Sequence, residues 1–399
     1  MYREILEDSR RLKGELTSFL QELIRIPSPS LRERAVADRV EGAMEELGYH
    51  LVTRDDHGNV VGLVLKDEAL PTILLSSHMD TVVPSPGWSR APLDAQIEGG
   101  RLYGLGAADC KGGLAAQLYA GHILAHSLLP LRGNLIVAAT VAEQNGCSVG
   151  LRHLIERTLP ELDLAPTFAI LGEPTALGLC YGHDGWAEVD VRVEGGSRAR
   201  VSHAVELIRR ELDGVPANRL RPEWPLVDIR ALSPVVCDAE SGGVVRVSRR
   251  LLHGESAQGF VHWVQRRAAV ARSLGSMSVE VQLREEPQRL YTGETTSVRF
   301  CSEPWTSNPF DPMVDRARDA LVAAGIPPVL RRWQLRQLGM GTAGGYLVRN
   351  GIQTVGFGPG DEAQAHACDE SIELDSLIQA TYATAVLAHA FIGGSALKM

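Results

Sequence analysis

PTILLSSHMD, residues 71–80, is an apolar run that ends on two polar residues, His78 and Asp80. A run of this length and composition is typical of a buried strand. Two later runs have the same form, NLIVAATVAE at 134–143 and TFAILGEP at 167–174. They are preceded by a segment rich in small residues that suits a helix, GGLAAQLYAGHILAHSL at 112–128. Strands that alternate with helices in this way predict an α/β fold, a mostly parallel sheet covered by helices on both faces.

The segments on either side continue this pattern. Apolar residues at helical spacing predict an amphipathic helix over 4–26, which IPSPS ends, and a second helix over 31–47. GNVVGLVLK is a further candidate for a buried strand. After Pro304 the alternation resumes with a helix at 313–325, a strand at 354–360 and a C-terminal helix from 373.

The character of the sequence changes after Tyr181. WAEVDVRVEG, VVRVSRRLL and MSVEVQLRE are strand-like, and SHAVELIRREL and GFVHWVQRRAAVARSL between them are helix-like. The resulting β-α-β-α-β order indicates a small α+β domain inserted into the first. We therefore expect a main domain made of residues 1–180 and 293–399, interrupted by an inserted domain at 181–292.

Composition restricts the class of protein. The chain has 399 residues, 44% of them apolar, and a formal net charge of −9, which disfavours nucleic acids and anionic membranes as partners. Six scattered cysteines form no CxxC pair, so we expect reduced thiols rather than a disulfide framework. The first residues are charged and lack the apolar core of a signal peptide, and no apolar run is long enough to span a membrane. These features predict a cytoplasmic protein.

Several polar residues stand where parallel strands would end, the edge at which α/β sheets bind ligands. Two imidazoles and several carboxylates at one edge would suit Zn²⁺. Each residue alone has a plainer interpretation, such as a hydrogen-bonded histidine, a turn glutamate or a helix N-cap. The candidates are His78, Asp80, Asp109 before a Gly-rich helix start, Glu143, Gln144, Glu173 and the late His366.

Six stretches together resemble the co-catalytic zinc hydrolase family that includes acetylornithine deacetylase, succinyl-diaminopimelate desuccinylase, aminoacylase and carboxypeptidase G. They occur in the order and at the spacing of that family, and the resemblance covers nearly the whole chain, with the inserted domain as its weakest part. The stretches are LLSSHMDTVVP, GRLYGLGAADCKGGLAA, TVAEQNGCSVG, AILGEPT, GHDGWAEVDV and TVGFGPGDEAQAHACDESIEL.

The resemblance implies roles for these residues. His78 and Glu173 resemble the terminal ligands of one zinc ion, Asp109 the carboxylate that bridges two ions, and His366 a ligand of the second ion. Asp80 resembles the residue that orients His78, and Glu143 the general base that takes a proton from the metal-bound water. One or two Zn²⁺ ions are implied, with Co²⁺ or Mn²⁺ as substitutes. The inserted domain resembles a lid through which members of the family often form homodimers.

The sequence departs from the family pattern near the base. The Asp-Glu-Glu-x-Gly stretch of the family reads Ala-Glu-Gln-Asn-Gly at residues 142–146. Gly146 fixes the register, which places Gln144 on a metal-ligand position normally held by glutamate. A neutral carboxamide brings no charge, so the second metal site should be weaker. The alternative register makes Glu143 the ligand and leaves no base.

Two further departures concern the substrate. From Gly196, the Gly-x-x-x-His motif of the lid places Arg200 where the family has an oxyanion-stabilising histidine; Arg200 or the nearby His203 would take that role. The Gly-Thr-Asp stretch of the family has Ala343 in place of its aspartate. Arg249 and Arg250 are candidates for binding a substrate carboxylate, although two exposed arginines on an edge strand are an equally good interpretation.

We therefore expect a metal-dependent hydrolase that cleaves an amide bond of an N-acyl amino acid, a small peptide or a related small molecule. Because three positions of one site are altered, two alternatives stay open. One is an inert homologue that keeps the pocket as a binding or regulatory protein. The other is an enzyme that runs acyl transfer in the amide-forming direction.

Overall fold

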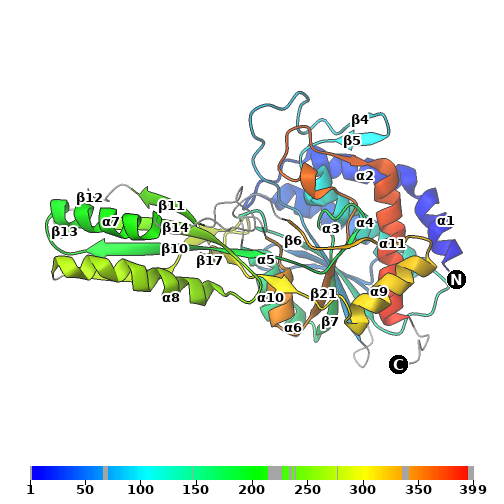
Figure 1. The fold of residues 1–399 in the computed structure, drawn as a ribbon. Helices are drawn as coiled ribbons and strands as arrows, with labels where there is room; N and C mark the ends of the chain where they lie inside the picture. Colours follow the sequence, from blue (N-terminus) through cyan, green and yellow to red (C-terminus); the bar gives the residue numbers. More distant parts are fainter. Residues whose placement is uncertain are drawn as a thin grey trace.

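A computed structural model of the chain describes residues 2–65, 71–145, 147–213, 227–232, 236–237, 240–275, 277–334 and 341–393. Figure 1 shows a layered α/β body from which a second, elongated unit extends to one side. The body contains both ends of the described chain, and the extension is built from its middle third. The predicted α/β fold with an inserted α+β part is confirmed.

The body is organised around a sheet of eight strands in the order β1-β2-β6-β3-β7-β21-β8-β20. Its four central strands, β6, β3, β7 and β21, are parallel, while β1 and β2 extend the sheet in antiparallel fashion. The sheet is therefore mixed at its edges and parallel at its centre. The strands are β1 (Leu51–Arg54), β2 (Val60–Leu65), β3 (Thr72–His78), β6 (Asn134–Thr140), β7 (Pro166–Leu171), β8 (Leu179–Cys180), β20 (Leu330–Arg331) and β21 (Gln353–Gly356).

Helices cover both faces of this sheet because the central strands are apolar on both sides. Leu75 and Val137 pack under one group of helices, and Leu74 and Ile136 pack under the other. The first group is α1 (Arg3–Arg11), α2 (Lys13–Arg25), α3 (Arg34–Glu46), α4 (Gly112–His126), α9 (Pro312–Ala323) and α11 (Leu374–Ile392); the second is α5 (Val149–His153), η2 (Leu154–Thr158), α6 (Leu159–Glu161) and α10 (Gly344–Arg349).

The N-terminal segment corrects one expectation. The single helix predicted over 4–26 is divided at Leu12, whose ψ of 0° leaves the helical region, into α1 and α2. The division lets α1 pack on α11 while α2 packs on α4. Periodicity did not reveal the break because Leu12 is itself apolar and buried. Within the described residues, no helix combines the length and apolarity needed to cross a membrane.

The extension contains the three strands and two helices that the sequence predicted, together with further strands after the first helix that the sequence analysis missed, the longest being Val227–Leu232. Its antiparallel strands lie in the order β11-β14-β10-β15, with β18 paired to the base of β10. Val189, Val191 and Val193 of β10 face a single apolar core with residues of both helices. The elements are β10 (Gly185–Glu194), α7 (Arg198–Asp213), β11 (Val227–Leu232), β14 (Gly243–Leu251), α8 (Ala257–Ala268), η3 (Ala269–Leu274), β15 (Ser278–Leu283) and β18 (Cys301–Ser302). The domain boundaries at 181 and 292 stay a prediction.

Short elements complete the fold at the junctions. A hairpin follows β15 close to the body, and a small three-stranded sheet joins the segment before α4 to the segment before α11. These elements are β4 (Gln96–Glu98), β5 (Arg101–Tyr103) and β22 (Ser371–Glu373); β9 (Gly182–His183) and β19 (Trp305–Thr306); β12 (Val236–Cys237) and β13 (Glu240–Ser241); β16 (Glu285–Arg289) and β17 (Thr295–Arg299); and the turns η1 (Ala107–Lys111) and η4 (Glu362–Gln364).

The close approach of α4 to the end of β7 yields a stability prediction. A Cβ atom on Gly113 would lie 1.8 Å from the carbonyl oxygen of Gly172. Gly113→Ala should therefore lower the free energy of unfolding by about 1–3 kcal/mol or more. Gly42→Ala in α3 is the matched control: its Cβ meets nothing within 4 Å, and it should stabilise by up to about 1 kcal/mol. Thermal unfolding of both variants is the measurement, and an unchanged midpoint for Gly113→Ala would contradict this packing.

Candidate metal and hydrolytic site

Six side chains meet where the parallel strands of the body end. Because these strands run in the same direction, the residues that follow them emerge at one edge of the sheet. The structure therefore brings together residues that the sequence spreads over almost 300 positions. They are His78 at the end of β3, Asp109 in the turn η1, Glu143 and Gln144 after β6, Glu173 after β7, and His366 in the loop before β22.

The imidazole of His78 is oriented by the loop that follows it. Its Nδ1 donates to the carbonyl oxygen of Asp80 at 2.8 Å, and the carboxylate Oδ1 of Asp80 lies 3.4 Å away. This contact directs Nε2 toward the acids, 3.2 Å from Asp109 Oδ1 and 4.0 Å from Glu173 Oε2. A second partner that fixes the ring and its tautomer is typical of histidines that bind metal.

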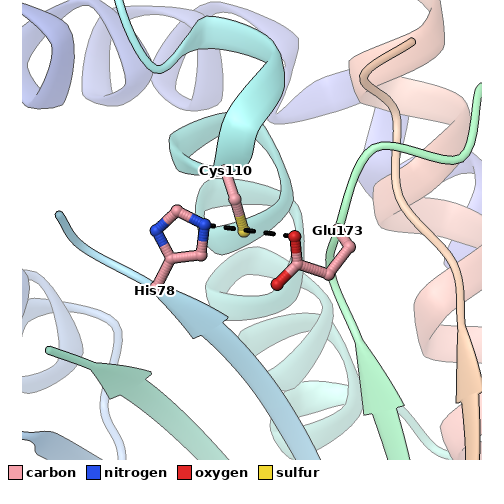
Figure 2. A group of neighbouring side chains, drawn as sticks. All are labelled: His78, Cys110 and Glu173. Carbon is pink, nitrogen blue, oxygen red and sulfur yellow. Dashed lines mark ion pairs between the residues drawn. The ribbon is translucent and has the colours of Figure 1, made fainter. Parts of the chain in front are cut away.

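The thiol of Cys110 is a possible ligand that the sequence analysis missed. One ligand atom each from His78, Cys110 and Glu173 lie within 4.8 Å of one another, and all three residues are buried. Figure 2 shows the sulfur beside the line that joins the imidazole to the carboxylate. Sequence offered no signal for this residue, because an isolated cysteine lacks the paired spacing of a zinc motif.

Gln144 occupies the position between Asp109 and His366. Its Oε1 lies 2.6 Å from His366 Nε2, and its Nε2 donates to Asp109 Oδ2 at 2.8 Å. His366 Nε2 and Asp109 Oδ2 are themselves 3.2 Å apart. The carboxamide therefore satisfies the atoms with which both residues would bind a second ion. A glutamate at this position could not donate a hydrogen bond to Asp109. The metal-binding atoms of Asp109 and His366 would then remain available to a cation.

The Asp80 carboxylate connects His78 to the segment that carries the base. It accepts hydrogen bonds from the backbone N–H of Glu143 at 3.1 Å, that of Gln144 at 2.8 Å, and the hydroxyl of Ser30 at 2.5 Å. Asp80 is fully buried. Its effect is broader than the orientation of His78 expected from the sequence, because the same carboxylate holds the backbone at Glu143 and Gln144 in place.

Glu370 has a comparable effect on Asp109, and the sequence analysis did not single it out. Its carboxylate accepts from the backbone N–H groups of Gly106 at 2.9 Å, Ala108 at 2.8 Å and Asp109 at 2.9 Å. Glu370 lies four residues after His366, so it joins the loop of one candidate ligand to the turn of another. No pattern marks such a residue, since its partners are backbone groups distant in the sequence.

The environment of Glu143 suits a general base. Burial raises the pKa of Glu143 to about 7, while His78 and the hydrogen bond from Ser148 act to lower it. The hydroxyl of Ser148 donates to Glu143 Oε1 at 2.7 Å. A base is most effective when its pKa lies near the working pH, so a carboxylate that titrates close to neutrality is well matched to proton transfer.

The remaining charges of the site fit a bound cation. Burial, together with the neighbouring acid Asp109, raises the pKa of Glu173 to about 8 against the lowering effect of His78. Burial alone would lower the pKa of His78, but Cys110 and Asp109 hold it well above its ordinary value. A doubly charged ion among these groups would stabilise the ionised Glu173. Imidazole nitrogens and carboxylate oxygens are also the donors that Zn²⁺ prefers.

The two candidate oxyanion residues lie in the extension. Arg200 and His203 are on α7 with exposed side chains, and the guanidinium of Arg200 donates to the carbonyl oxygen of Leu274 at the end of η3. None of the described contacts of the six site residues involves either side chain. Gly146, which set the register of the base, lies outside the described residues. Ala343 is buried in the core beneath α10.

The structure separates the two candidate carboxylate-binding arginines. The guanidinium of Arg249 pairs with Glu255 and lies 5.6 Å from the ring centre of Phe260, on the helix-covered face. Arg250 points the other way, is buried, and contributes positive charge beside His183 at the base of the extension. Alternation along β14 causes the separation, because successive side chains of a strand face opposite ways.

Comparison with known proteins agrees with this geometry. The model of peptidase family M20/M25/M40 matches residues 74–390, most of the chain. This chain belongs to that family. Its members hydrolyse amide and peptide bonds with bound metal, so the chain is a metal-dependent hydrolase, and the inert alternative gains no support.

Three similar proteins show how far the similarity extends. The chain is 26% identical over 386 residues to the Escherichia coli (strain K12) protein YgeY, which covers 92% of both chains. It is 29% identical over 374 residues to a putative [LysW]-lysine/[LysW]-ornithine hydrolase of Pyrobaculum aerophilum, covering 90% of this chain and 92% of that one. The Bacillus subtilis YXEP protein, a dinuclear metal-binding peptidase, has the same fold with a TM-score of 0.68, 13% identity and coverage of 95% and 98%.

Asp80 contacts His78 and the backbone of both Glu143 and Gln144, so replacing it tests how these residues are held at the site. Asp80→Asn would turn an amide N–H toward the backbone donors of Glu143 and Gln144, so both residues should move. We expect metal affinity to fall by roughly 10–100-fold, the usual cost of losing a residue that orients ligands. Ser30→Ala, which removes a single donor to Asp80, should have a much smaller effect. Metal titration by calorimetry is the measurement, and equal affinities in all three proteins would rule out this role.

Proposed function

We propose that this family member is a zinc-dependent deacylase or peptidase that cleaves the amide bond of an N-acyl amino acid or a small peptide. The observation that supports the proposal is the position of Glu143. Its carboxylate, whose pKa is near 7, follows β6 at the edge where the imidazole and carboxylate donors meet. A screen of zinc-loaded protein against N-acyl amino acids and dipeptides tests it directly. Turnover of none of them would count against the substrate class.

The side chains divide the work as follows. Zn²⁺, when bound, supplies a Lewis acid that polarises the substrate carbonyl and makes water more acidic. His78, Asp109 and Glu173 would hold it, with the thiol of Cys110 close to two of them. Glu143 accepts the proton of the attacking water and passes it to the leaving amine. Ser148 keeps the Glu143 carboxylate in position for both transfers.

We propose one strongly bound ion and a weaker second one. The pair Gln144 and His366 contributes no charge beyond the shared Asp109, and the three groups already satisfy one another by hydrogen bonds. An incoming ion must break these contacts and gains no extra carboxylate in return. The first group, with His78 and Glu173, keeps its full anionic complement. Co²⁺ and Mn²⁺ are proposed as substitutes for zinc.

Other features belong to the same proposal. We propose that Arg200 or His203 stabilises the oxyanion after the extension closes over the site or from a second copy of the chain. A homodimer formed through the extension is supported by β15, which within the described residues pairs on one side only, with β10. Arg250 is the better candidate of the two arginines for a substrate carboxylate. We also propose a cytoplasmic location.

Replacement of the base tests its assignment. Glu143→Ala should lower turnover by at least about 10²-fold, the smaller of the usual effects of a general base. Metal content and the unfolding temperature should stay close to those of the parent, because Glu143 is not a ligand in this register. The exposed Glu161→Ala in α6 serves as the control. Loss of metal from Glu143→Ala would instead make Glu143 a ligand and the assignment of Gln144 wrong.

Restoring the charge at Gln144 tests the second ion. Gln144→Glu should tighten the weaker site by about tenfold or more, since a unit charge close to the ion is worth more than about 1.4 kcal/mol. Asn145→Asp adds the same charge one residue away, where the side chain contacts Gln288 instead, and should leave the stoichiometry unchanged. Metal content after dialysis is the readout. If Gln144→Glu holds no more metal than the parent, Gln144 is not at the site.

A further inference from the structure

A cavity lies beside Glu143, the proposed base, on the face of the sheet covered by α5 and α10. It has a volume of about 240 Å³ and is lined by both main-domain helices and the base of the extension. Its floor is polar and buried, formed by Ser148, Ser302 and Thr342 together with the thiol of Cys301. None of the residues proposed to hold the metal is among its lining residues. A volume of this size suits a small metabolite or one arm of a larger one.

Among the described residues, one of the three arginines around the cavity forms no ion pair, although the acids Glu156 and Glu303 also line it. Two of its three lining arginines are paired: Arg349 lies 2.8 Å from Glu303, and Arg299 lies 3.1 Å from Glu285. Among the described residues, none forms an ion pair with the third, Arg152, whose buried Nε also lacks a hydrogen-bond partner. The Arg152 side chain is half-buried, and a guanidinium whose Nε is withdrawn from water without a hydrogen-bond partner is stabilised when an anion joins it.

The cavity is connected to the reaction site through a single residue. Ser148 lines the cavity and also donates its hydroxyl to Glu143 Oε1 at 2.7 Å. The backbone N–H of Arg152 donates to the carbonyl oxygen of Ser148 at 3.0 Å, one helical turn along α5. Arg152 is therefore held in a fixed relation to the loop of the base. A ligand bound to Arg152 would lie next to the residue that positions Glu143.

We propose that this cavity is a binding site for a carboxylate group, held by the guanidinium of Arg152. The planar guanidinium presents donors that match the two oxygens of a carboxylate. The ring of Tyr346, whose centre is 5.4 Å from the guanidinium carbon, supports it from the side. Glu156, which also lines the cavity, accepts the hydroxyl hydrogen of Tyr346 at 2.6 Å and forms no ion pair with Arg152 among the described contacts.

The carboxylate can come from two sources, and each source has a different effect on the reaction. It is either a second acidic group of the amide substrate, which would make the enzyme selective for acidic acyl or amino acid groups, or a free carboxylate that acts on Glu143 through Ser148. The substrate as the source rests on the proposed function, whereas binding of a carboxylate to the cavity does not. Direct binding and substrate selectivity are therefore measured separately.

Direct binding is tested with succinate and zinc-loaded protein by isothermal titration calorimetry. Arg152→Gln should weaken succinate binding at least about tenfold, because hydrogen bonds to charged groups are worth about 1.5–3 kcal/mol. Arg152→Lys, which keeps the charge, should lie between Arg152→Gln and the parent. Arg157→Gln removes an exposed arginine of the neighbouring η2, which does not line the cavity, and should bind as the parent does. Equal binding by Arg152→Gln and the parent, or none by the parent, overturns the proposal.

Kinetics then distinguish the sources. If the carboxylate belongs to the substrate, Arg152→Gln lowers kcat/KM for an N-succinyl amide but not for the N-acetyl amide of the same amine, and succinate competes with the first. If it is a free ligand, succinate changes the rate on both amides without competing. Succinate binding without hydrolysis of any amide would reject the proposed function and keep the carboxylate site. Hydrolysis without Arg152-dependent binding would do the reverse.

Discussion

The parallel pairing of β3 with β6 and β7 is the constraint on which the rest of the structure depends. In this register His78 lies opposite Thr140, and Ser76 opposite Leu171. The residues that follow the three strands consequently emerge side by side. Antiparallel pairing of either neighbour would carry Glu143 or Glu173 to the far edge of the sheet. The site is therefore a result of strand direction before it is a result of any side-chain contact.

Burial of several acids at that edge is costly, and the surrounding structure reduces the cost in two ways. Backbone donors satisfy some of the carboxylates: Asp80 accepts from the loop after β6, and Glu370 from the turn η1. Imidazoles satisfy Asp109, whose pKa they lower although burial acts to raise it. Among the described residues, no comparable set of donors reaches Glu173, and burial raises its pKa to about 8. A cation is the partner that these charges still require.

The substitution at Gln144 changes this balance within the family scaffold. A carboxamide both donates and accepts, so it can join Asp109 to His366 without any ion. A carboxylate in the same place can only accept and would be repelled by Asp109 until a cation arrived. The amide nitrogen of Gln144, in place of a carboxylate oxygen, therefore decides whether these three side chains bond to one another or need a metal ion. The same reasoning applies to Arg152, which forms no ion pair among the described residues and for which we propose an anionic ligand.

The sequence by itself determined the α/β class, the inserted α+β segment and six of the side chains at the site. Apolar periodicity sets element type locally, and motif order carries the register of the family. Only the tertiary structure decided the rest. Cys110 and Glu370 act through neighbours that are near in space, some of them backbone groups, so no spacing in the chain could mark them. Arg249 and Arg250 are adjacent in sequence, yet strand geometry sends them to opposite faces. The break at Leu12 and the cavity beside Ser148 follow from the packing of distant segments, which local patterns do not encode.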